Sequence, residues 1–221
     1  MKCYAIAIDG PSASGKSTVA KIVANKLNYL YVDTGAMYRA FTLACLKNNI
    51  DPKNENLACS LIGKINISFN KDNKITLDNV DVSKEIRMDN VADNVSYIAS
   101  YGNVRKELVR LQREIAKNRN VVMDGRDIGS FVLSDADLKI YQIADSNERA
   151  NRRYKENIEK GMTSSFDEIL NNIKKRDYID SHRKCSPLIA AKDSITIDTT
   201  NMSINEVANK ILEICKEKGI K

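Results

Sequence analysis

The residues that indicate chemistry most directly lie close to the N-terminus. Residues 10–17 read GPSASGKS and fit the pattern G-x-x-x-x-G-K-[ST] at each fixed position. An apolar run precedes the pattern and a helical period begins inside it, so backbone N–H groups can turn toward an anion at a helix N-terminus. Lys16 is then expected to reach the β- and γ-phosphates of a nucleoside triphosphate, and Ser17 to offer its hydroxyl to Mg²⁺.

This loop predicts a binding site for ATP or a related triphosphate. The residues expected to contact it are Gly10, Pro11, Ser12, Ala13, Ser14, Gly15, Lys16, Ser17 and Thr18. A guanine-specific protein should carry N-K-x-D, whereas residues 25–28 read NKLN and lack the aspartate. A small kinase acting on a second small molecule fits the short chain and its scattered arginines, because guanidinium groups neutralise the charge on transferring phosphates.

The positive charge of the chain is concentrated in one segment. The 221 residues include 35 Lys and Arg against 29 Asp and Glu, which gives a net charge of +6. Residues 149–184 alone hold ten basic and six acidic residues. Such an excess suits an anionic partner, which can be a nucleic acid, an acidic membrane or a phosphorylated small molecule. A solvated helix face is the alternative interpretation.

Composition excludes several other classes of protein. A hydrophobic content of 43% without low-complexity tracts excludes disorder, and no window of about 18 apolar residues exists that could span a membrane. The first apolar run is too short for a signal peptide, so we expect a cytoplasmic protein. Five scattered cysteines and one histidine, His182, argue against a disulfide framework and a zinc site. We expect reduced thiols that pack as small hydrophobic side chains.

The elements needed to position the loop follow from hydrophobic periodicity. Short apolar runs at residues 3–8 and 29–32 alternate with helical periods at 16–27 and 34–47. This order predicts an α/β fold with a doubly wound parallel sheet. Further strands are expected at residues 121–123, 138–143 and 194–198, and a final helix at 204–216.

Two segments depart from that rhythm. Residues 65–87 alternate apolar and polar side chains around a polar turn, which predicts an antiparallel insert of two or three strands. Helices are expected at 89–100 and 103–117, with Arg110, Arg113 and Arg119 on a solvated face. The basic segment reads as a helical hairpin, and capping signals at 145–148, 165–168 and 203–206 mark three helix starts. Asp33, just before a helix, is either a cap or a ligand.

Four motifs in colinear order resemble the bacterial cytidylate kinases, a family of P-loop nucleoside monophosphate kinases. Besides the phosphate loop, residues 33–39 read DTGAMYR and resemble the D-[ST]-G-x-x-Y-R motif of that family. Residues 124–129 read DGRDIG and resemble D-G-R-D-[IM]-G. Residues 176–188 carry R-D-x-x-D-x-x-R followed by P-L. Ala13 stands where a glycine is common in the family, and the resemblance extends from Lys2 to about Cys215.

The resemblance implies transfer of the γ-phosphoryl group of ATP to CMP or dCMP, with Mg²⁺. Positions implied to bind the acceptor nucleotide are Thr34, Arg39, Ser96, Arg105, Arg126, Asp127, Asp180 and Arg183. Among them Thr34, Ser96, Arg105 and Asp127 hold the base, Arg39, Arg126 and Arg183 hold the phosphate, and Asp180 takes a ribose hydroxyl. Arg149, Arg152 and Arg153 lie on a lid helix, and the implied catalytic residues are Lys16, Arg126, Arg183, Arg149 and Arg153.

The chemistry of these residues agrees with the resemblance. An aspartate acceptor with an arginine donor can recognise cytosine, whereas the O4 of uracil would leave Asp127 unpaired in a closed site. Mg²⁺ would be held by Ser17, ATP oxygens and waters, with Asp124 orienting one of the waters. The expected division is a core at 1–33, 103–148 and 186–221, an acceptor region at 34–102 and a lid at 149–185, all within one domain.

Two other functions stay open at this point. One is a kinase for another acceptor, such as UMP, dUMP, AMP or a sugar acid. The other is a basic NTPase stimulated by nucleic acid, although the tyrosines show no stacking pattern for single strands. For the kinase we expect ATP and CMP or dCMP as partners, a monomer, and no binding to nucleic acid or membrane.

Overall fold

The computed structural model describes residues 2–70, 73–159, 161, 163 and 165–221. The chain forms two compact units, one made of Met1–Tyr31 with Asn118–Lys221 and the other of Val32–Lys117. The second unit ends with the helix Gly102–Ala116, whereas the sequence assigned residues from 103 onward to the core. The division into core, acceptor region and lid stays a prediction.

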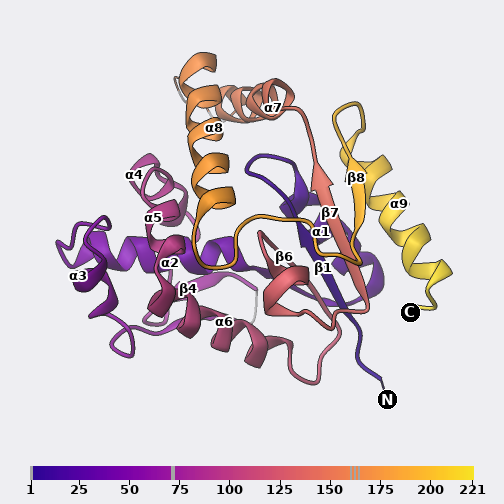
Figure 1. The fold of residues 1–221 in the computed structure, drawn as a ribbon, viewed down its shortest axis with the longest axis horizontal. Helices are drawn as coiled ribbons and strands as arrows, with labels where there is room; N and C mark the ends of the chain where they lie inside the picture. Colours follow the sequence, from indigo (N-terminus) through magenta and orange to yellow (C-terminus); the bar gives the residue numbers. More distant parts are fainter. Residues whose placement is uncertain (1, 71–72, 160, 162, 164) are drawn as a thin grey trace. The chain divides into compact units, whose positions relative to one another are not determined.

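The first unit contains a parallel sheet with the strand order β2-β6-β1-β7-β8 (Figure 1). Its strands are β1 (Ala5–Asp9), β2 (Leu30–Asp33, of which the first two residues belong to this unit), β6 (Val121–Gly125), β7 (Leu138–Ile143) and β8 (Ile195–Asp198). Its helices are α1 (Lys16–Leu27), the π-helical turn η2 (Ile128–Val132), α7 (Ser146–Glu159), α8 (Phe166–His182) and α9 (Ile204–Glu217). Strands β6 and β7 both run parallel to β1, which confirms the predicted α/β class with a parallel sheet.

The register of the sheet brings the ends of three strands together. Asp9, the last residue of β1, is paired with Gly125 of β6 on one side and with Tyr141 of β7 on the other. The phosphate loop leaves β1 at this edge, and residues 126–129 leave β6 at the same edge. Ligands of open α/β folds bind at the carboxyl ends of the strands, so this edge is where a site is expected.

Helices α1 and α9 pack against each other and against the sheet (Figure 1). Val19 and Val23 of α1 are buried with Ile211 of α9 and with Ile8 and Ile140 of the strands. Fully burying such a side chain contributes about 1.5–3 kcal/mol. Ser203 caps α9 through a capping box with Glu206, and Ser165 caps α8, as the sequence predicts.

The second unit packs helices around a three-stranded antiparallel sheet of order β3-β4-β5. Its elements are α2 (Thr34–Lys47), α3 (Glu55–Cys59), β3 (Ile67–Phe69), β4 (Ile75–Leu77), β5 (Val80–Asp81), the 3₁₀ turn η1 (Glu85–Arg87), α4 (Asp89–Ala92), α5 (Val95–Ser100) and α6 (Gly102–Ala116). The sheet confirms the antiparallel insert predicted for residues 65–87.

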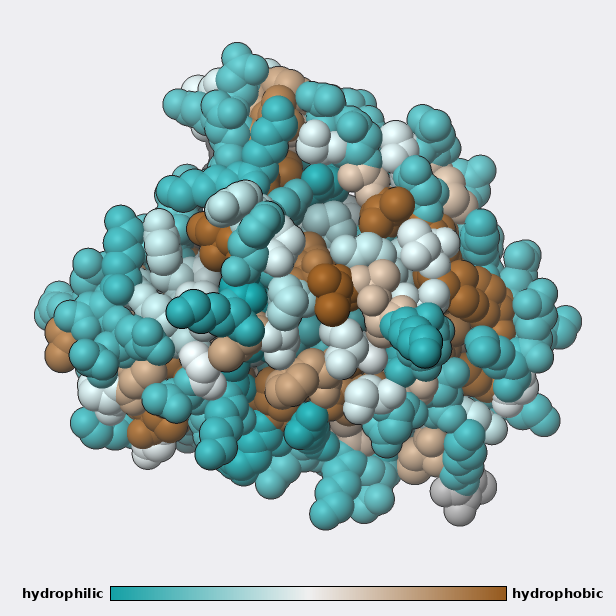
Figure 2. Space-filling view, in the orientation of Figure 1, coloured by the Kyte–Doolittle hydropathy of each residue, from teal (hydrophilic) through white to brown (hydrophobic). Residues whose placement is uncertain are grey.

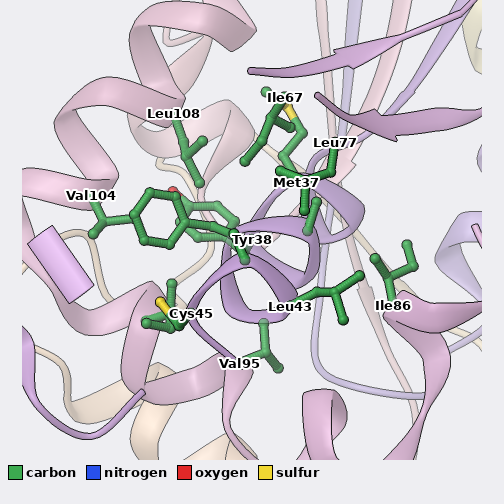
Figure 3. Close-up of a cluster of buried hydrophobic side chains, with 14 of the residues drawn as sticks. Met37, Tyr38, Leu43, Cys45, Ile67, Leu77, Ile86, Val95, Val104 and Leu108 are labelled. Carbon is green, nitrogen blue, oxygen red and sulfur yellow. The ribbon is translucent and has the colours of Figure 1, made fainter. Parts of the chain in front are cut away.

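The core of this unit surrounds α2 (Figure 3). Met37 points toward Ile67 and Leu77 of the small sheet, whereas the adjacent Tyr38 points toward Val104 and Leu108 of α6. Successive residues of a helix face different directions, so one helix can hold the sheet and α6 together. Packing on several sides therefore holds α2 in place within this unit.

Two sequence expectations are corrected by the structure. The single helix expected at 89–100 is two helices, α4 and α5, and between them the Asn94 side chain donates to the Asn90 carbonyl at 2.8 Å. Such side-chain bonding competes with the helix backbone. The thiols are free as expected, but Cys3 and Cys185 are exposed rather than packed.

The surface offers no continuous apolar face in the view of Figure 2, where brown side chains form several small groups among teal and white ones. The large exposed hydrophobic residues come from several separate elements. Among the described residues, no helix is long and apolar enough to cross a membrane.

Candidate active site

The phosphate loop joins β1 to α1 and is held close to β7. Gly10 passes so near the Gln142 backbone that an added Cβ would collide with its carbonyl oxygen. Gly15 caps α1 at a φ of 85°, in the left-handed region that favours glycine. Ala13 also has a positive φ, 57°, at the position where the family commonly has glycine. The loop thus has the tight backbone course that anion binding by N–H groups requires.

The two functional side chains of the loop are both positioned. Lys16 is 7% exposed and its Nζ donates to the Pro11 carbonyl at 3.2 Å. Ser17 Oγ donates to Asp124 Oδ2 at 2.7 Å, and Tyr31 donates its hydroxyl to the other oxygen, Oδ1, at 2.8 Å. The structure therefore brings Ser17 and Asp124 together, as the magnesium prediction requires, and Tyr31 is a partner that sequence reasoning missed.

The outer side of the loop is bound by helices α7 and α8, which pack against each other (Figure 1). Arg149 Nη1 donates to the Ser12 carbonyl at 3.0 Å and to Asp177 Oδ2 at 2.7 Å. Ser12 N–H in turn donates to Asp177 Oδ1 at 3.4 Å. One residue of the loop is therefore bound through both its carbonyl and its N–H.

The other lid arginines differ from Arg149 in their surroundings. Arg152 donates to the Ser14 and Thr199 carbonyls, and the Gln142 side-chain amide also donates to the Ser14 carbonyl. Arg153 pairs with Glu156 of its own helix at 3.1 Å and is more exposed. Arg149 and Arg152 thus contact loop carbonyls in this structure, and contact of the three arginines with a triphosphate stays a prediction.

Four predicted acceptor residues of the first unit form two ion pairs beside β6. Arg126 Nε donates to Asp180 Oδ2 at 2.8 Å, and Arg183 Nη2 lies 3.4 Å from Asp127 Oδ1. Burial favours the neutral acid at Asp180, but the guanidinium groups of Arg126 and Arg183 outweigh it and hold the pKa of that carboxyl below its usual range. Arg183 Nε also donates to the Ser186 carbonyl at 2.7 Å, which fixes the guanidinium plane.

The other four predicted acceptor residues lie in the second unit, on three helices that pack together. Thr34 and Arg39 are on α2, Ser96 on α5 and Arg105 on α6. Arg105 lies over the Tyr38 ring, with 5.7 Å between its Cζ and the ring centroid, and is 3% exposed. Thr34, Ser96 and Arg105 are all buried, and buried polar side chains are normally hydrogen-bonded. Arg105 Nη1, for example, donates to the Ala99 carbonyl at 3.3 Å.

Asp33 is a helix cap in the structure. Its side chain accepts from Ala36 N–H at 2.8 Å and from Arg39 Nη2 at 3.0 Å. Of the two interpretations that the sequence left open, capping is confirmed, and the same carboxylate also orients the guanidinium of Arg39.

One buried carboxylate at the strand edge was not predicted. Asp9 is 4% exposed and accepts backbone N–H groups from Ile128 and Gly129, both at 2.7 Å. Burial raises its pKa to about 7 against the opposing effect of those two hydrogen bonds. Its place directly before Gly10 at the end of a strand is the only sequence signal that could have found it.

A parallel sheet with a phosphate loop between its central strand and a helix defines the class of P-loop α/β nucleotide-binding proteins. Two solved structures share this fold. A shikimate kinase from Acinetobacter baumannii aligns over 100% of this chain and 97% of its own at a TM-score of 0.50 and 13% identity. An uncharacterized protein from Eubacterium ventriosum aligns over 98% and 99% at 0.54 and 14%. At these identities the likeness concerns the fold alone.

The family follows from the sequence comparisons. The cytidylate kinase family model matches residues 6–217. A cytidylate kinase from Leuconostoc mesenteroides is 51% identical over 97% of this chain and 97% of its own length, and one from Bacillus pumilus is 52% identical over 96% of each. The chain belongs to the cytidylate kinase family. The predicted family, kinase fold and phosphotransferase class are thereby confirmed.

Proposed function

We propose that the protein transfers the γ-phosphoryl group of ATP directly to CMP or dCMP, which yields ADP and CDP or dCDP. The observation that carries this proposal is the phosphate loop, with buried Lys16 and with Ser17 bonded to Asp124, in a chain that matches the cytidylate kinase family over residues 6–217. The family match supports cytidylate and does not favour uridylate as the acceptor.

The donor half of the reaction uses the loop. Its N–H groups and the start of α1 bind the phosphates of ATP, and the Lys16 ammonium offsets the charge on the β- and γ-phosphates. The attacking group is a phosphate oxygen of CMP, which is already an anion. No general base is therefore needed, and the protein acts by positioning the reactants and by neutralising charge.

The residues present fit Mg²⁺. A hydroxyl and a carboxylate oxygen, those of Ser17 and Asp124, lie 2.7 Å apart, and Mg²⁺ prefers such hard oxygen ligands together with substrate phosphates. Ser17 would hold the ion directly and Asp124 through a water molecule. When bound with ATP, the ion offsets phosphate charge. The described residues contain no group of three or more His, Cys, Asp or Glu able to hold a metal by themselves.

The acceptor half uses the charged pairs beside β6. Arg126 and Arg183 are proposed to bind the CMP phosphate, and the paired carboxylates Asp180 and Asp127 hold these guanidinium groups in place in the structure. Asp127 accepts the cytosine amino group and Asp180 a ribose hydroxyl. Arg39 adds a phosphate contact, and base contacts come from Thr34, Ser96 and Arg105.

The lid arginines complete the proposal. Arg149 and Arg153 would neutralise charge on the transferring group, with Arg152 beside them on α7. The expected partners are ATP and CMP or dCMP, with no nucleic acid and no membrane. We propose a cytoplasmic monomer.

Product analysis tests this function against a nucleic-acid-stimulated NTPase. Purified protein is incubated with ATP and Mg²⁺, with CMP, RNA or buffer alone, and nucleotides are quantified by ion-exchange chromatography. We expect equal amounts of ADP and CDP with CMP and almost no ADP in the other two mixtures. Release of ADP that depends on RNA and not on CMP would contradict the proposal.

Substitutions test the acceptor residues. We expect Asp127→Ala and Arg183→Ala each to lower kcat/KM for CMP about 100-fold or more, because each leaves a buried charge unpaired and removes a substrate contact. The Kd for ATP should change little. Arg110→Ala is the matched control, since Arg110 is exposed and pairs with Glu107 and Glu114 of its own helix.

A further inference from the structure

The buried carboxylate of Asp9 has no part in the chemistry described so far. It lies at the end of the central strand β1, and each of its oxygens accepts one backbone N–H, Oδ1 from Ile128 and Oδ2 from Gly129. The two donors are 119 and 120 residues away in the sequence. Asp9 therefore connects the strand before the phosphate loop to the residues that follow Arg126 and Asp127.

The two N–H groups belong to the first residues of η2. N–H groups in the first turn of a helix have no partner within it and are satisfied by a capping side chain. Asp127 occupies the capping position of this turn, and aspartate is a residue type that favours it. Yet the Asp127 side chain makes no capping hydrogen bond, and its carboxylate lies 3.4 Å from Arg183 instead.

Asp9, and not the adjacent Asp127, therefore caps η2. Asp9 satisfies the N–H groups of Ile128 and Gly129, so Asp127 has no need to turn its carboxylate back toward its own turn. The turn itself is closed by backbone bonds, since Phe131 and Val132 both donate to the Asp127 carbonyl, at 2.9 and 3.0 Å. The carbonyl of Asp127 and the two residues that follow it are therefore held by hydrogen bonds.

We propose that Asp9 is a positioning residue for recognition of the acceptor base. By capping η2 it keeps the Asp127 carboxylate out of the cap and directed to Arg183 and the cytosine amino group. This inference rests on the proposed function, because it assigns Asp9 to the same acceptor site and acts only through Asp127.

Burying the Asp9 carboxylate is energetically unfavourable, which supports a functional reason for capping η2 in this way. Burial raises the pKa of Asp9 to about 7, and the carboxylate of Asp127 repels it. The two N–H groups and the nearby Lys16 favour its charged form. A serine or asparagine near the turn would cap it without burying a charge.

The test compares the steady-state kinetics of Asp9→Asn with those of the unsubstituted protein. KM and kcat are measured for CMP and for UMP at saturating ATP, and KM for ATP is then measured at saturating CMP. The amide keeps the size but can accept only through one oxygen. We expect KM for CMP to rise about tenfold and the preference for CMP over UMP to fall about tenfold, since one capped N–H loses its partner. KM for ATP should change less than about twofold. Thermal unfolding monitors folding, and Asp9→Ser replaces the amide if Asp9→Asn is unfolded.

A double-mutant cycle separates positioning from a general loss of structure. In an Asp127→Ala background, Asp9→Asn should lower kcat/KM for CMP less than about twofold further, because the residue through which it acts is gone. Equal loss toward CMP and UMP, or additive losses in the two backgrounds, would overturn the role of Asp9 while leaving the kinase proposal intact. Absence of CMP turnover in the unsubstituted protein would overturn both.

Discussion

Asp124 accepts hydrogen bonds from two hydroxyl groups that have different origins. Ser17 belongs to the phosphate loop motif, and Tyr31 belongs to β2. If Asp124 acts at a magnesium site, the two bonds have different functions. Ser17 shares the site with it, whereas Tyr31 only orients the carboxylate from behind, as outer partners of metal sites do.

This difference gives a prediction at the scale of single residues. Asp124→Asn should raise the Mg²⁺ concentration needed for half-maximal rate about 10- to 100-fold, because a charged oxygen near the ion is lost. Tyr31→Phe is the matched control, which removes one bond to the same carboxylate and should raise that concentration less than about threefold. Steady-state rates over a magnesium series provide the measurement. Equal shifts in the two variants would count against a metal role for Asp124.

The chemistry of single residues was predictable where it is local. Lys16 and Ser17 follow from a contiguous motif whose backbone course is fixed by its own glycines. The partners of the loop were not predictable, because Gln142 and Asp177 lie more than a hundred residues away from it in the sequence and reach it only through folding. No local pattern marks such a pairing.

Helix α7 shows how one element gives similar side chains different environments. Arg149 and Arg153 are four residues apart and so lie on neighbouring positions of one helix face. Arg149 is 6% exposed and bonded to the Ser12 and Ala144 carbonyls and to Asp177. Arg153 is more exposed and pairs with Glu156, which lies one turn further along the same helix. Periodicity predicts the shared face but not which arginine is buried.

The two arginines should therefore differ in their contributions to the stability of the fold. Arg149→Ala is expected to lower the free energy of unfolding by about 3 kcal/mol, because it removes the buried guanidinium that pairs with Asp177 and donates to the Ser12 carbonyl. Arg153→Ala should cost less than about 1 kcal/mol, since it removes a half-exposed pair. Urea unfolding followed by circular dichroism measures both. Similar costs for the two variants would contradict this assignment of α7.

At the scale of the whole molecule, several arginines of the basic segment at residues 149–184 are engaged in ion pairs. Arg149 pairs with Asp177 and Arg153 with Glu156 inside this segment, and Arg152 pairs with Glu148, which directly precedes it. The alternation of strands and helices sufficed to predict the parallel sheet, and the alternation of apolar and polar side chains in residues 65–87 sufficed to predict the antiparallel insert. The strand order and the π-helical turn at 128–132 were not predictable, since both depend on contacts between distant segments.

The pH dependence of stability is a second property of the whole molecule. The native pKa of Asp9 is about 7, above its ordinary value, so the folded protein takes up a proton that the unfolded chain does not hold between about pH 4 and 7. Stability from this group is therefore present at low pH and lost as pH rises toward 7. The stability of the unsubstituted protein minus that of Asp9→Asn should fall by about 2 kcal/mol from pH 5 to pH 8.

Urea unfolding of both proteins at the two pH values gives this difference directly. The comparison cancels the carboxyls whose pKa is lowered in the fold, such as Asp180, because both proteins contain them. A difference that stays constant or grows with pH would show that Asp9 is ionised throughout this range.

The central claim is that this chain phosphorylates cytidylate, and the ratio of kcat/KM for CMP to kcat/KM for UMP tests it most directly. Both values come from one coupled assay of ADP release at saturating ATP and Mg²⁺, with dCMP and AMP in the same series. We predict a ratio of about 100 or more in favour of CMP, because uracil would leave the Asp127 carboxylate unpaired. A ratio near one, or turnover of UMP above that of CMP, would contradict the account.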